Sequence, residues 1–547
     1  MRIFTTLLAL MAALSISAQE EKTFIPVDES AEKMQEGPFR PTWESLSQYE
    51  VPEWFRDAKF GIWAHWGPQC VEGSGDWMAR EMYHEGSGKY QYHREHYGHP
   101  SQVGFKDILP LFKAEKWQPD SLLAYYKKVG ARYFFALGNH HDNFDLWDSQ
   151  YQPWNSKRIG PHRDILGEWA SAARKAGLPL GVSLHADHAW RWYESAQRSD
   201  KTGEYADIPY DGMLTKADGV GKWWEGLDPQ DLYAQNHPLS KDSWDNRSIH
   251  QQWDWTHGAT LPSRAFVTNF YNRTLDAINR YSPDLLYFDV TVLPFNDISD
   301  CGLKIVAHHY NHSIATHGGA NWAVAFGKIL DEKQRKAITW DVERGAPNAI
   351  QELPWQTCTC LGDWHWNEGV SKNNRYKNAP TVIKLLVDVV SKNGNLLLSV
   401  PLRADGTFDE HEHAILEDIR AWLAQNGEAI YATRPWTVFG EGPIAEEDIK
   451  MNAQGFNESS YMKAGASEIR FTQTAKALYA IPLGWPEDGK IVVKTLSKGN
   501  KWLKKKVKKV TLLGYGRLKA TQTPDGLLVT LPSTHTNDIA PVLRIEK

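Results

Sequence analysis

Residues 283–289 read Pro283-Asp284-Leu285-Leu286-Tyr287-Phe288-Asp289, a short apolar run that ends in a carboxylate. Five further short apolar runs with polar or ionisable groups near their ends occupy residues 60–65, 132–141, 179–185, 337–343 and 395–400. Helix-length segments separate several of these runs, which predicts β-strands alternating with α-helices. This order is typical of a parallel (β/α)8-like barrel, in which side chains at the carboxyl ends of the strands converge on one face and form the active site.

Helix signals support the alternation. Segments with helical apolar spacing or helix stop signals cover residues 120–129, 165–176, 270–281, 381–392 and 411–425. From about residue 440 the pattern changes to short alternating runs separated by turn residues, which predicts a small antiparallel β-sandwich. We therefore expect an α/β protein with a lead-in arm over residues 19–45, a barrel over 46–437 and a C-terminal sandwich over 438–547.

Residues 1–18 begin with Arg2, continue as a short apolar stretch and end in small residues before a charged segment. This pattern is typical of a secretory signal peptide, and the stretch is too short for a permanent membrane anchor. We expect an exported protein, periplasmic or secreted, with no membrane partner.

The bulk composition narrows the class of protein further. The 547 residues carry a formal net charge of -6 and no long basic block dominates, so nucleic acid is not an expected partner. Four cysteines are too few for a disulfide scaffold. Six lysines between residues 501 and 509 form a basic run, which is usually a solvated edge. Binding of an anionic glycan, such as a sulfated one, is the alternative for this run.

Two strand-end carboxylates indicate hydrolysis of a sugar linkage. Retaining glycosidases need one carboxylate as nucleophile and a second carboxyl group as acid/base, about 5–5.5 Å apart. Asp289 suits the nucleophile, and Glu343 suits the acid/base if burial raises its pKa. Asp341 faces the same side of an extended strand as Glu343 and is the local competitor, so the acid/base stays open between them.

The tandem His140-His141 and the group His185-Ala186-Asp187-His188 raise the question of a metal site. Neighbouring residues of a strand point to opposite faces, and no HxH or HExxH spacing occurs nearby. We therefore expect no metal and no cofactor, and we assign these imidazoles to hydrogen bonds with substrate hydroxyls.

Residues 190–260 contain seven tryptophans in an otherwise polar stretch between the third and fourth predicted strands. Aromatic faces stack on sugar rings, so a substrate-lining loop is one interpretation. Large anchors that hold a long loop in place are the other, and the sequence leaves the two open.

Several motifs resemble glycoside hydrolase family 29, the retaining α-L-fucosidases. Phe60-Gly61-Ile62-Trp63-Ala64-His65-Trp66-Gly67 is similar to the family's FGIFxHWG segment, and residues 139–147 resemble KHHDGFxLW. Further similar segments are residues 77–83, Trp154-Asn155, residues 163–165, 393–398 and 426–431. The resemblance covers nearly the whole mature chain, including the sandwich.

The resemblance implies a role for each matching residue. Asp289 would be the nucleophile, and Glu343 stands where part of the family carries its acid/base. The implied substrate-binding residues are His65, Trp77, His140, His141, Trp154 and His185. The substrate would be an oligosaccharide or polysaccharide with terminal α-L-fucose; oligomeric state is left open.

The chain departs from the family pattern at Asn139, Asn143, His185 and Tyr287. We expect these changes to lie at the sugar pocket, where extra polar groups would accept the C6 hydroxyl that distinguishes L-galactose from L-fucose. An exo-α-L-galactosidase acting on algal galactans, sulfated ones included, is therefore the close alternative. A carbohydrate-binding pseudoenzyme and a metal-dependent hydrolase using the histidines are the alternatives from other classes.

Overall fold

The computed structural model describes residues 23–241, 255, 258–503, 506–534 and 538–546. The predicted signal peptide, Trp244, Trp253, Lys504 and Lys505 lie outside these residues. Among the described helices, none is both long enough and apolar enough to cross a membrane.

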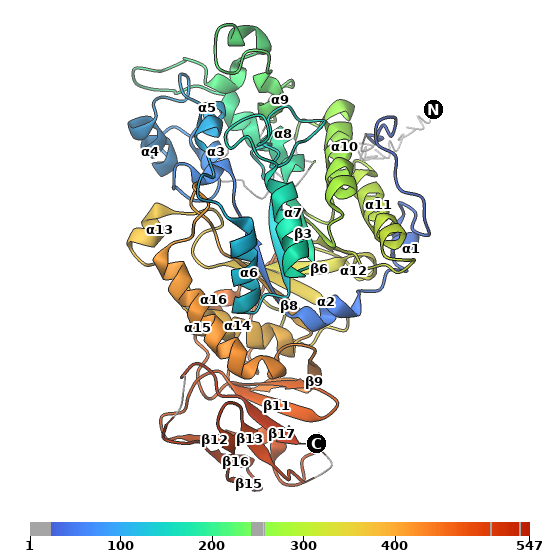
Figure 1. Cartoon of the computed structure of the whole chain (residues 1–547), viewed down its shortest axis with the longest axis vertical. Coiled ribbons are helices and arrows are strands. Elements are labelled where there is room, and N and C mark those ends of the chain that lie inside the picture. The colour runs from blue at the N-terminus through green and yellow to red at the C-terminus, as the bar shows by residue number, and fades with distance from the viewer. Residues whose placement is uncertain (1–22, 242–254, 256–257, 504–505, 535–537, 547) are drawn as a thin grey trace, which may run out of the picture.

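A closed barrel of parallel strands forms the centre of the described chain, in the order β1 to β8 (Figure 1). Its strands are β1 (Phe60–Ala64), β2 (Tyr133–Asn139), β3 (Leu180–Leu184), β4 (Leu285–Phe288), β5 (Val324–Gly327), β6 (Thr339–Glu343), β7 (Trp355–Cys360) and β8 (Gly394–Ser399). The barrel closes at β1, where Ile62 pairs with Phe134 of β2 and with Leu398 of β8. The predicted barrel and sandwich are confirmed.

Helices surround the barrel and account for the spacing between strands. The longer ones are α6 (Pro119–Val129), α7 (Ile165–Ala176), α10 (Arg264–Tyr281), α11 (Cys301–Thr316), α14 (Ala379–Ser391) and α15 (Glu410–Asn426). The shorter ones are α1 (Trp43–Leu46), α2 (Glu53–Ala58), α3 (Met78–Glu81), α4 (Gly88–His96), α5 (Phe105–Ile108), α8 (Ala189–Trp192), α9 (Pro229–Tyr233), α12 (Gln334–Ala337), α13 (Glu368–Lys372) and α16 (Glu458–Met462). The five predicted helices correspond to α6, α7, α10, α14 and α15. The stop signals act as expected, since α6 ends at Val129 and the next residue, Gly130, has a φ of 128° that favours glycine.

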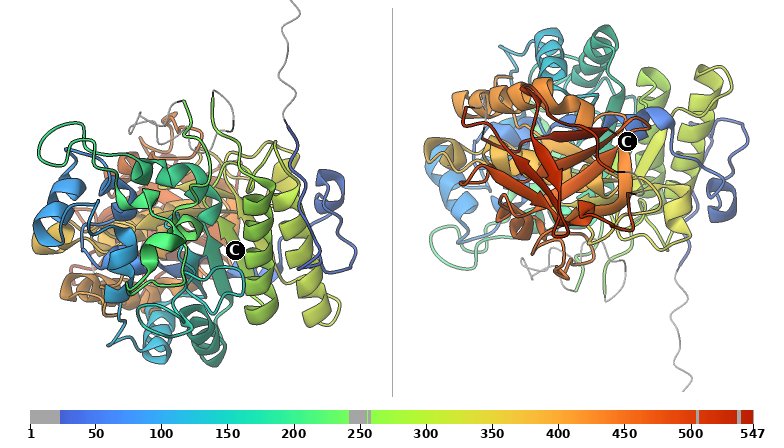
Figure 2. Two further views of the ribbon diagram at one scale, coloured as in Figure 1. Left: turned by 90° about the horizontal axis from the view of Figure 1, so that it is seen from above. Right: turned by 90° about the horizontal axis from the view of Figure 1, so that it is seen from below.

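The C-terminal strands form two antiparallel sheets at the end of the molecule opposite residues 190–241 (Figure 1; the sandwich faces the viewer in the right panel of Figure 2). The six-stranded sheet has the order β14-β13-β17-β11-β10-β9, and the three-stranded sheet has the order β12-β16-β15. Their bounds are β9 (Arg434–Glu441), β10 (Ile469–Gln473), β11 (Ala477–Pro482), β12 (Lys490–Val493), β13 (Val510–Leu512), β14 (Gly516–Arg517), β15 (Ala520–Gln522), β16 (Leu527–Thr530) and β17 (Leu543–Glu546).

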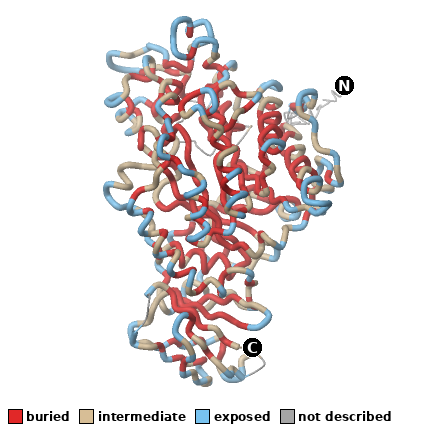
Figure 3. The backbone as a smooth tube through the Cα atoms, viewed as in Figure 1, coloured by how far each residue is buried: buried red, intermediate tan, exposed pale blue. Residues whose placement is uncertain are grey.

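Burial follows this architecture. The barrel strands and the inner faces of their helices are buried, whereas the loops at both ends of the molecule are exposed (Figure 3). The sandwich has a separate apolar core, which includes Trp436, Phe471 and Val529. After β9 the chain returns to the barrel over residues 442–466 before it enters β10, and this connection contributes to the site described next.

Candidate active site

Side chains at the carboxyl ends of six consecutive barrel strands meet in one cavity of about 270 Å³. His65, His140, His185, Asp289 and Lys328 belong to the residues that follow strands β1 to β5, and Glu343 is the last residue of β6. The parallel strand order brings these residues together although they are up to 278 positions apart in sequence.

Asp289 lines the cavity with its side chain 21% exposed. Its Oδ1 atom accepts a hydrogen bond from Lys328 Nζ at 2.5 Å, and His141 Nε2 lies 3.4 Å from Oδ2. Burial raises the pKa of Asp289, but the Lys328 charge, with His141 and His185, outweighs burial and holds the pKa well below its usual range. Asp289 is therefore an ionised carboxylate aimed into the cavity.

Lys328 also donates to Glu343 Oε2, at 2.7 Å, and so bridges the two carboxyl groups. Burial raises the pKa of Glu343, the Asp289 charge raises it further, and Lys328 opposes both; the net shift is upward. Two carboxyl groups whose pKa values are moved in opposite directions are the arrangement that acid/base chemistry requires.

Sequence reasoning missed Lys328 because it missed β5. The stretch Ala323-Val324-Ala325-Phe326-Gly327-Lys328 is a short apolar run ending in an ionisable group, so the rule that found Asp289 would have found Lys328 as well.

Asp341 lies deeper in the barrel than Glu343 and does not line the cavity. Its two oxygens accept hydrogen bonds from Gln356 Nε2 at 2.9 Å and from Cys358 Sγ at 3.3 Å. Burial raises the pKa of Asp341 to about 7. Glu343 is therefore the carboxyl group of β6 that a substrate can reach.

Three buried histidines line the cavity as neutral rings. Burial moves the pKa of His65 and His140 well below the usual range and that of His185 to about 4. Among the described residues, His65 Nδ1 and His185 Nε2 have no hydrogen-bond partner. Buried polar atoms are normally paired, so these nitrogens are suited to a ligand that carries hydroxyl groups.

Asp76 and His365 extend this polar surface and were missed by sequence reasoning. Asp76 lines the cavity, and its Oδ1 atom lies 2.6 Å from His365 Nδ1 and 3.7 Å from His140 Nε2. His365 follows β7, a strand that the apolar pattern did not reveal, and its neighbour Trp364 lines the cavity.

Trp77 lines the cavity in a left-handed backbone conformation, with a φ of 63°. Non-glycine residues in this conformation are concentrated at functional sites. Its ring packs edge-on against His141 and Trp192. Trp154, in contrast, does not line the cavity; it is buried and donates from Nε1 to the Asp228 carbonyl. His141 also lies behind the surface and reaches the site through Asp289.

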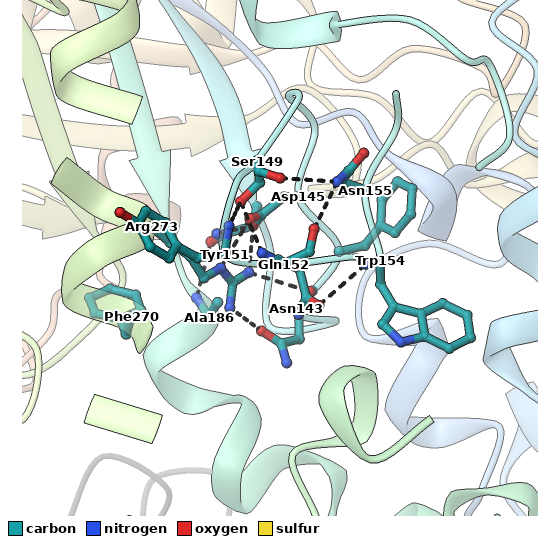
Figure 4. A network of polar contacts seen from close by, with 12 residues as sticks. Asn143, Asp145, Ser149, Tyr151, Gln152, Trp154, Asn155, Ala186, Phe270 and Arg273 are labelled. Atoms are coloured by element: carbon teal, nitrogen blue, oxygen red, sulfur yellow. Dashed lines mark hydrogen bonds and ion pairs between the residues drawn. The ribbon is translucent and has the colours of Figure 1, made fainter. Parts of the chain in front are cut away.

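Of the four departures from the family pattern, His185 and Tyr287 line the cavity as predicted, whereas Asn139 and Asn143 do not, so the prediction is wrong for these two. Asn139 donates to Asp145 and accepts from the backbone of His185, whereas Asn143 accepts from Arg273 at 2.6 Å. Arg273 also pairs with Asp145 (Figure 4). These amides hold the turn that follows His140 and His141, because a buried guanidinium and carboxylate need satisfied hydrogen bonds.

The tryptophans of the 190–260 insertion that the structure describes act as anchors. Trp192 and Trp224 are fully buried, Trp190 stacks on His237 and packs against Phe266, and Trp255 packs against Phe295. None of them, nor the exposed Trp223, lines the cavity at Asp289. The insertion supports Trp77 through Trp192 instead.

Three sets of side chains have ligand atoms within 4.8 Å of one another and could hold a metal ion geometrically. They are His65, His140 and His185; Asp76, His140 and His365; and His141, His185 and Asp289. In the third set, Lys328 already contacts the carboxylate, and a permanent cation at that distance opposes a second one.

One family of known proteins is similar to this chain over most of its length. The profile of the family described as α-L-fucosidase matches residues 27–428, and that of the α-L-fucosidase C-terminal domain matches residues 464–546. The chain is 26% identical to rat tissue α-L-fucosidase over 510 residues, which cover 90% of this chain and 88% of the relative. It is 27% identical to the bovine tissue enzyme, with 90% and 87% coverage.

Solved structures give the same relationship. The crystal structure of Thermotoga maritima α-fucosidase superposes with a TM-score of 0.64 at 25% identity and covers 93% of this chain and 100% of that chain. The same enzyme in complex with a mechanism-based inhibitor gives a TM-score of 0.65 at 25% identity, with the same coverage.

Proposed function

The chain belongs to the α-L-fucosidase family, glycoside hydrolase family 29, and from this premise we propose that it removes terminal α-L-fucose from glycans with retention of anomeric configuration. It is a glycoside hydrolase with a carbohydrate substrate. In the proposed mechanism, Asp289 is the nucleophile and Glu343 is the acid/base. The observation that carries the proposal is the contact of both carboxyl groups with Lys328 Nζ.

This shared contact supports retention rather than inversion. Asp289 Oδ1 and Glu343 Oε2 lie 2.5 and 2.7 Å from the same nitrogen, so they are separated by no more than roughly 5 Å. Inverting glycosidases need about 6.5–9.5 Å to place a water between the carboxyl groups. A covalent glycosyl-enzyme intermediate fits the shorter separation.

The proposed reaction has two steps. Ionised Asp289 attacks the anomeric carbon while Glu343 protonates the departing glycosidic oxygen, which forms the ester and releases the aglycone. Glu343, now a carboxylate, then takes a proton from the water that hydrolyses the ester. Lys328 keeps Asp289 ionised in the free enzyme, and the neutral nitrogens of His65 and His185 bind sugar hydroxyls.

The test is hydrolysis of nitrophenyl α-L-fucoside, with the product anomer read by NMR before mutarotation. We expect α-L-fucose as the first product. Asp289→Ala should lose turnover by several orders of magnitude while circular dichroism and melting temperature stay close to wild type. A β-anomer as first product, or near-normal turnover by Asp289→Ala, would contradict the proposed mechanism.

L-Galactose is a second candidate for the terminal sugar, and His185 favours it. Its Nδ1 atom lies 3.7 Å from Asp289 Oδ2, and its ring centroid lies 6.1 Å from that of Trp63 and 6.0 Å from that of Tyr287. Its Nε2 atom is available to a hydroxyl. A polar partner offsets the desolvation of the C6 hydroxyl, which a dry methyl pocket does not. The test is to compare kcat/KM on nitrophenyl α-L-fucoside with kcat/KM on nitrophenyl α-L-galactoside. A preference for the fucoside above about a thousandfold, roughly 4 kcal/mol, excludes L-galactose as the substrate sugar.

We further propose that catalysis needs no metal. Exhaustive chelation followed by assay in chelator should leave nitrophenyl fucoside turnover unchanged. Loss of activity that zinc or another divalent cation restores would assign one of the three histidine sets to a metal.

Export is the remaining part of the proposal. It rests on residues 1–18, and N-terminal sequencing of the protein from culture medium or periplasm should find a chain that lacks them. An intact N-terminus in the cytoplasm would exclude export.

A further inference from the structure

The connection between β9 and β10 returns to the barrel and runs alongside Glu343. Glu343 N donates to the Gln454 carbonyl at 2.9 Å, and Phe456 N donates to the Glu343 carbonyl at 2.8 Å. Residues 454–456 thus add a short strand-like segment beside β6, with Gly455 paired to Glu343. Gln454 and Phe456 line the same cavity as Asp289 and Glu343.

This segment is built into the barrel rather than lying loosely upon it. Asn457 exchanges hydrogen bonds with the backbone of Ala346, at 2.9 and 3.0 Å. The buried Glu458 carboxylate accepts from Arg344 Nε at 2.9 Å and from Thr359 Oγ1 at 2.7 Å. The backbone at Phe456 is therefore fixed relative to Glu343.

Phe456 itself is left open to solvent. Its side chain is 44% exposed although it borders a cavity. Its ring makes no contact with another aromatic ring among the residues that the structure describes. A fixed backbone that presents a large apolar face to solvent, beside a catalytic carboxyl group, is a feature of a binding surface.

We propose that Phe456 and Gln454 form the leaving-group subsite and that its occupant is a pyranose ring. The inference rests on the proposed function: if Glu343 protonates the glycosidic oxygen, the group attached to that oxygen lies next to Glu343 on the solvent side. The Phe456 ring stacks on the apolar face of this sugar, and the Gln454 amide hydrogen-bonds to one of its hydroxyls. The enzyme therefore selects fucosylated glycans over fucosides with small or flexible aglycones.

Three substrates separate this role from an effect on Glu343. The leaving group of α-L-fucosyl fluoride is not a sugar and needs little protonation. The leaving group of methyl α-L-fucoside needs protonation but is not a sugar. The leaving group of an α-L-fucosyl disaccharide needs protonation and is a sugar ring. We expect Phe456→Ala to lower kcat/KM roughly tenfold on the disaccharide alone, the size of effect that an aromatic contact supplies. Gln454→Ala should show the same selectivity with a smaller loss.

The reverse direction provides a second measurement. Because the acceptor in transglycosylation occupies the leaving-group subsite, Phe456→Ala should reduce transfer from fucosyl fluoride to a free pyranoside without reducing hydrolysis. Tyr515→Ala, an exposed aromatic of the sandwich, is the matched control and should change neither rate.

The outcomes are distinct. If Phe456→Ala lowers kcat/KM equally on methyl fucoside and on the disaccharide, Phe456 acts by positioning Glu343. If kcat/KM on the disaccharide is unchanged, Phe456 does not bind substrate. Either result overturns the proposal. Failure of the wild-type enzyme to release fluoride from α-L-fucosyl fluoride would instead contradict the proposed function itself.

Discussion

The assignment of roles on β6 depends on how deep each residue lies in the barrel. Asp341 and Glu343 point to the same side of the strand, as alternation predicts. They differ because Asp341 is one layer below the cavity, bonded to Gln356 and Cys358, whereas Glu343 ends the strand with its side chain 14% exposed. Sequence periodicity identifies the face of a strand but not the layer, so this choice required the structure.

We predict that Glu343→Ala loses about a hundredfold or more in kcat/KM on methyl α-L-fucoside, because that aglycone leaves only when protonated. On nitrophenyl fucoside the first step should stay fast, and azide should restore turnover with formation of a fucosyl azide. Asp341→Asn is the matched control and should show no azide product. Rescue of the Asp341 variant but not the Glu343 variant would reverse the assignment.

Lys328 sets the protonation state of its neighbour in the free enzyme. In Lys328→Met, the pKa of Asp289 should rise, because burial then acts without the opposing charge. The nucleophile must be ionised, so the acidic limb of the kcat/KM profile should move to higher pH by about one to three units. Lys328→Arg retains the charge and should keep a limb near that of wild type. A Met variant with an unchanged limb would mean that Lys328 does not control Asp289.

At the scale of elements, the apolar pattern revealed six of the barrel strands and missed two. β5 has four residues, as β4 does, and its apolar run before Lys328 fits the same rule, so it was predictable, whereas β7 contains Gln356, Thr357 and Thr359, which are polar yet fully buried. Their polarity is satisfied inside the barrel, for example by Thr357 donating to the Val342 carbonyl. A pattern method that equates burial with apolar residues does not find such a strand, and Lys328 and His365 were missed with them.

The segment beside β6 is a further element that sequence alone did not reveal. Gly455 has a φ of 141°, and a Cβ atom there would lie 2.1 Å from the Glu343 carbonyl oxygen. We predict that Gly455→Ala displaces residues 454–456 and with them Glu343. Turnover of methyl fucoside should fall tenfold or more, while fucosyl fluoride is affected much less.

Gly465→Ala is the matched control for this variant. Gly465 lies in the same connection, but a Cβ atom there would have no heavy atom within 4 Å. Gly465→Ala should leave turnover of methyl fucoside and of fucosyl fluoride unchanged. Equal rates for the Gly455 and Gly465 variants would show that the segment has no influence on Glu343.

At the scale of the molecule, the sandwich is part of the structure that carries the site. The chain leaves the barrel into β9, returns to flank Glu343, and enters the sandwich again at β10. The motifs of the C-terminal half predicted the sandwich, but no composition signal marks a connection that borders an active site. Local sequence patterns predict helices and strands, whereas the contact of Glu343 with residues 454–456 joins residues more than a hundred positions apart.

A buried ion pair joins the two parts, and it provides the last prediction. Arg470 of β10 donates from Nε to Asp388 Oδ1 of α14 at 2.6 Å, and Lys392 Nζ contacts the other oxygen at 2.7 Å; Arg470 and Asp388 are fully buried. Arg470→Leu leaves Asp388 with one partner less, which should lower the free energy of unfolding by about 3–5 kcal/mol.

Burial raises the pKa of Asp388, but Lys392 and Arg470 outweigh burial and hold this pKa below the usual value. The pair therefore stabilises the fold fully above the unfolded pKa of about 4 and loses its contribution as the pH falls through the folded pKa. Thermal unfolding at pH 7 and at decreasing pH should show a large gap between wild type and Arg470→Leu that narrows in acid. Lys450→Ala, which removes an exposed ion pair with Asp448, is the control and should change the melting temperature little. A gap that is small at pH 7, or that widens in acid, would show that this pair does not hold the sandwich to the barrel.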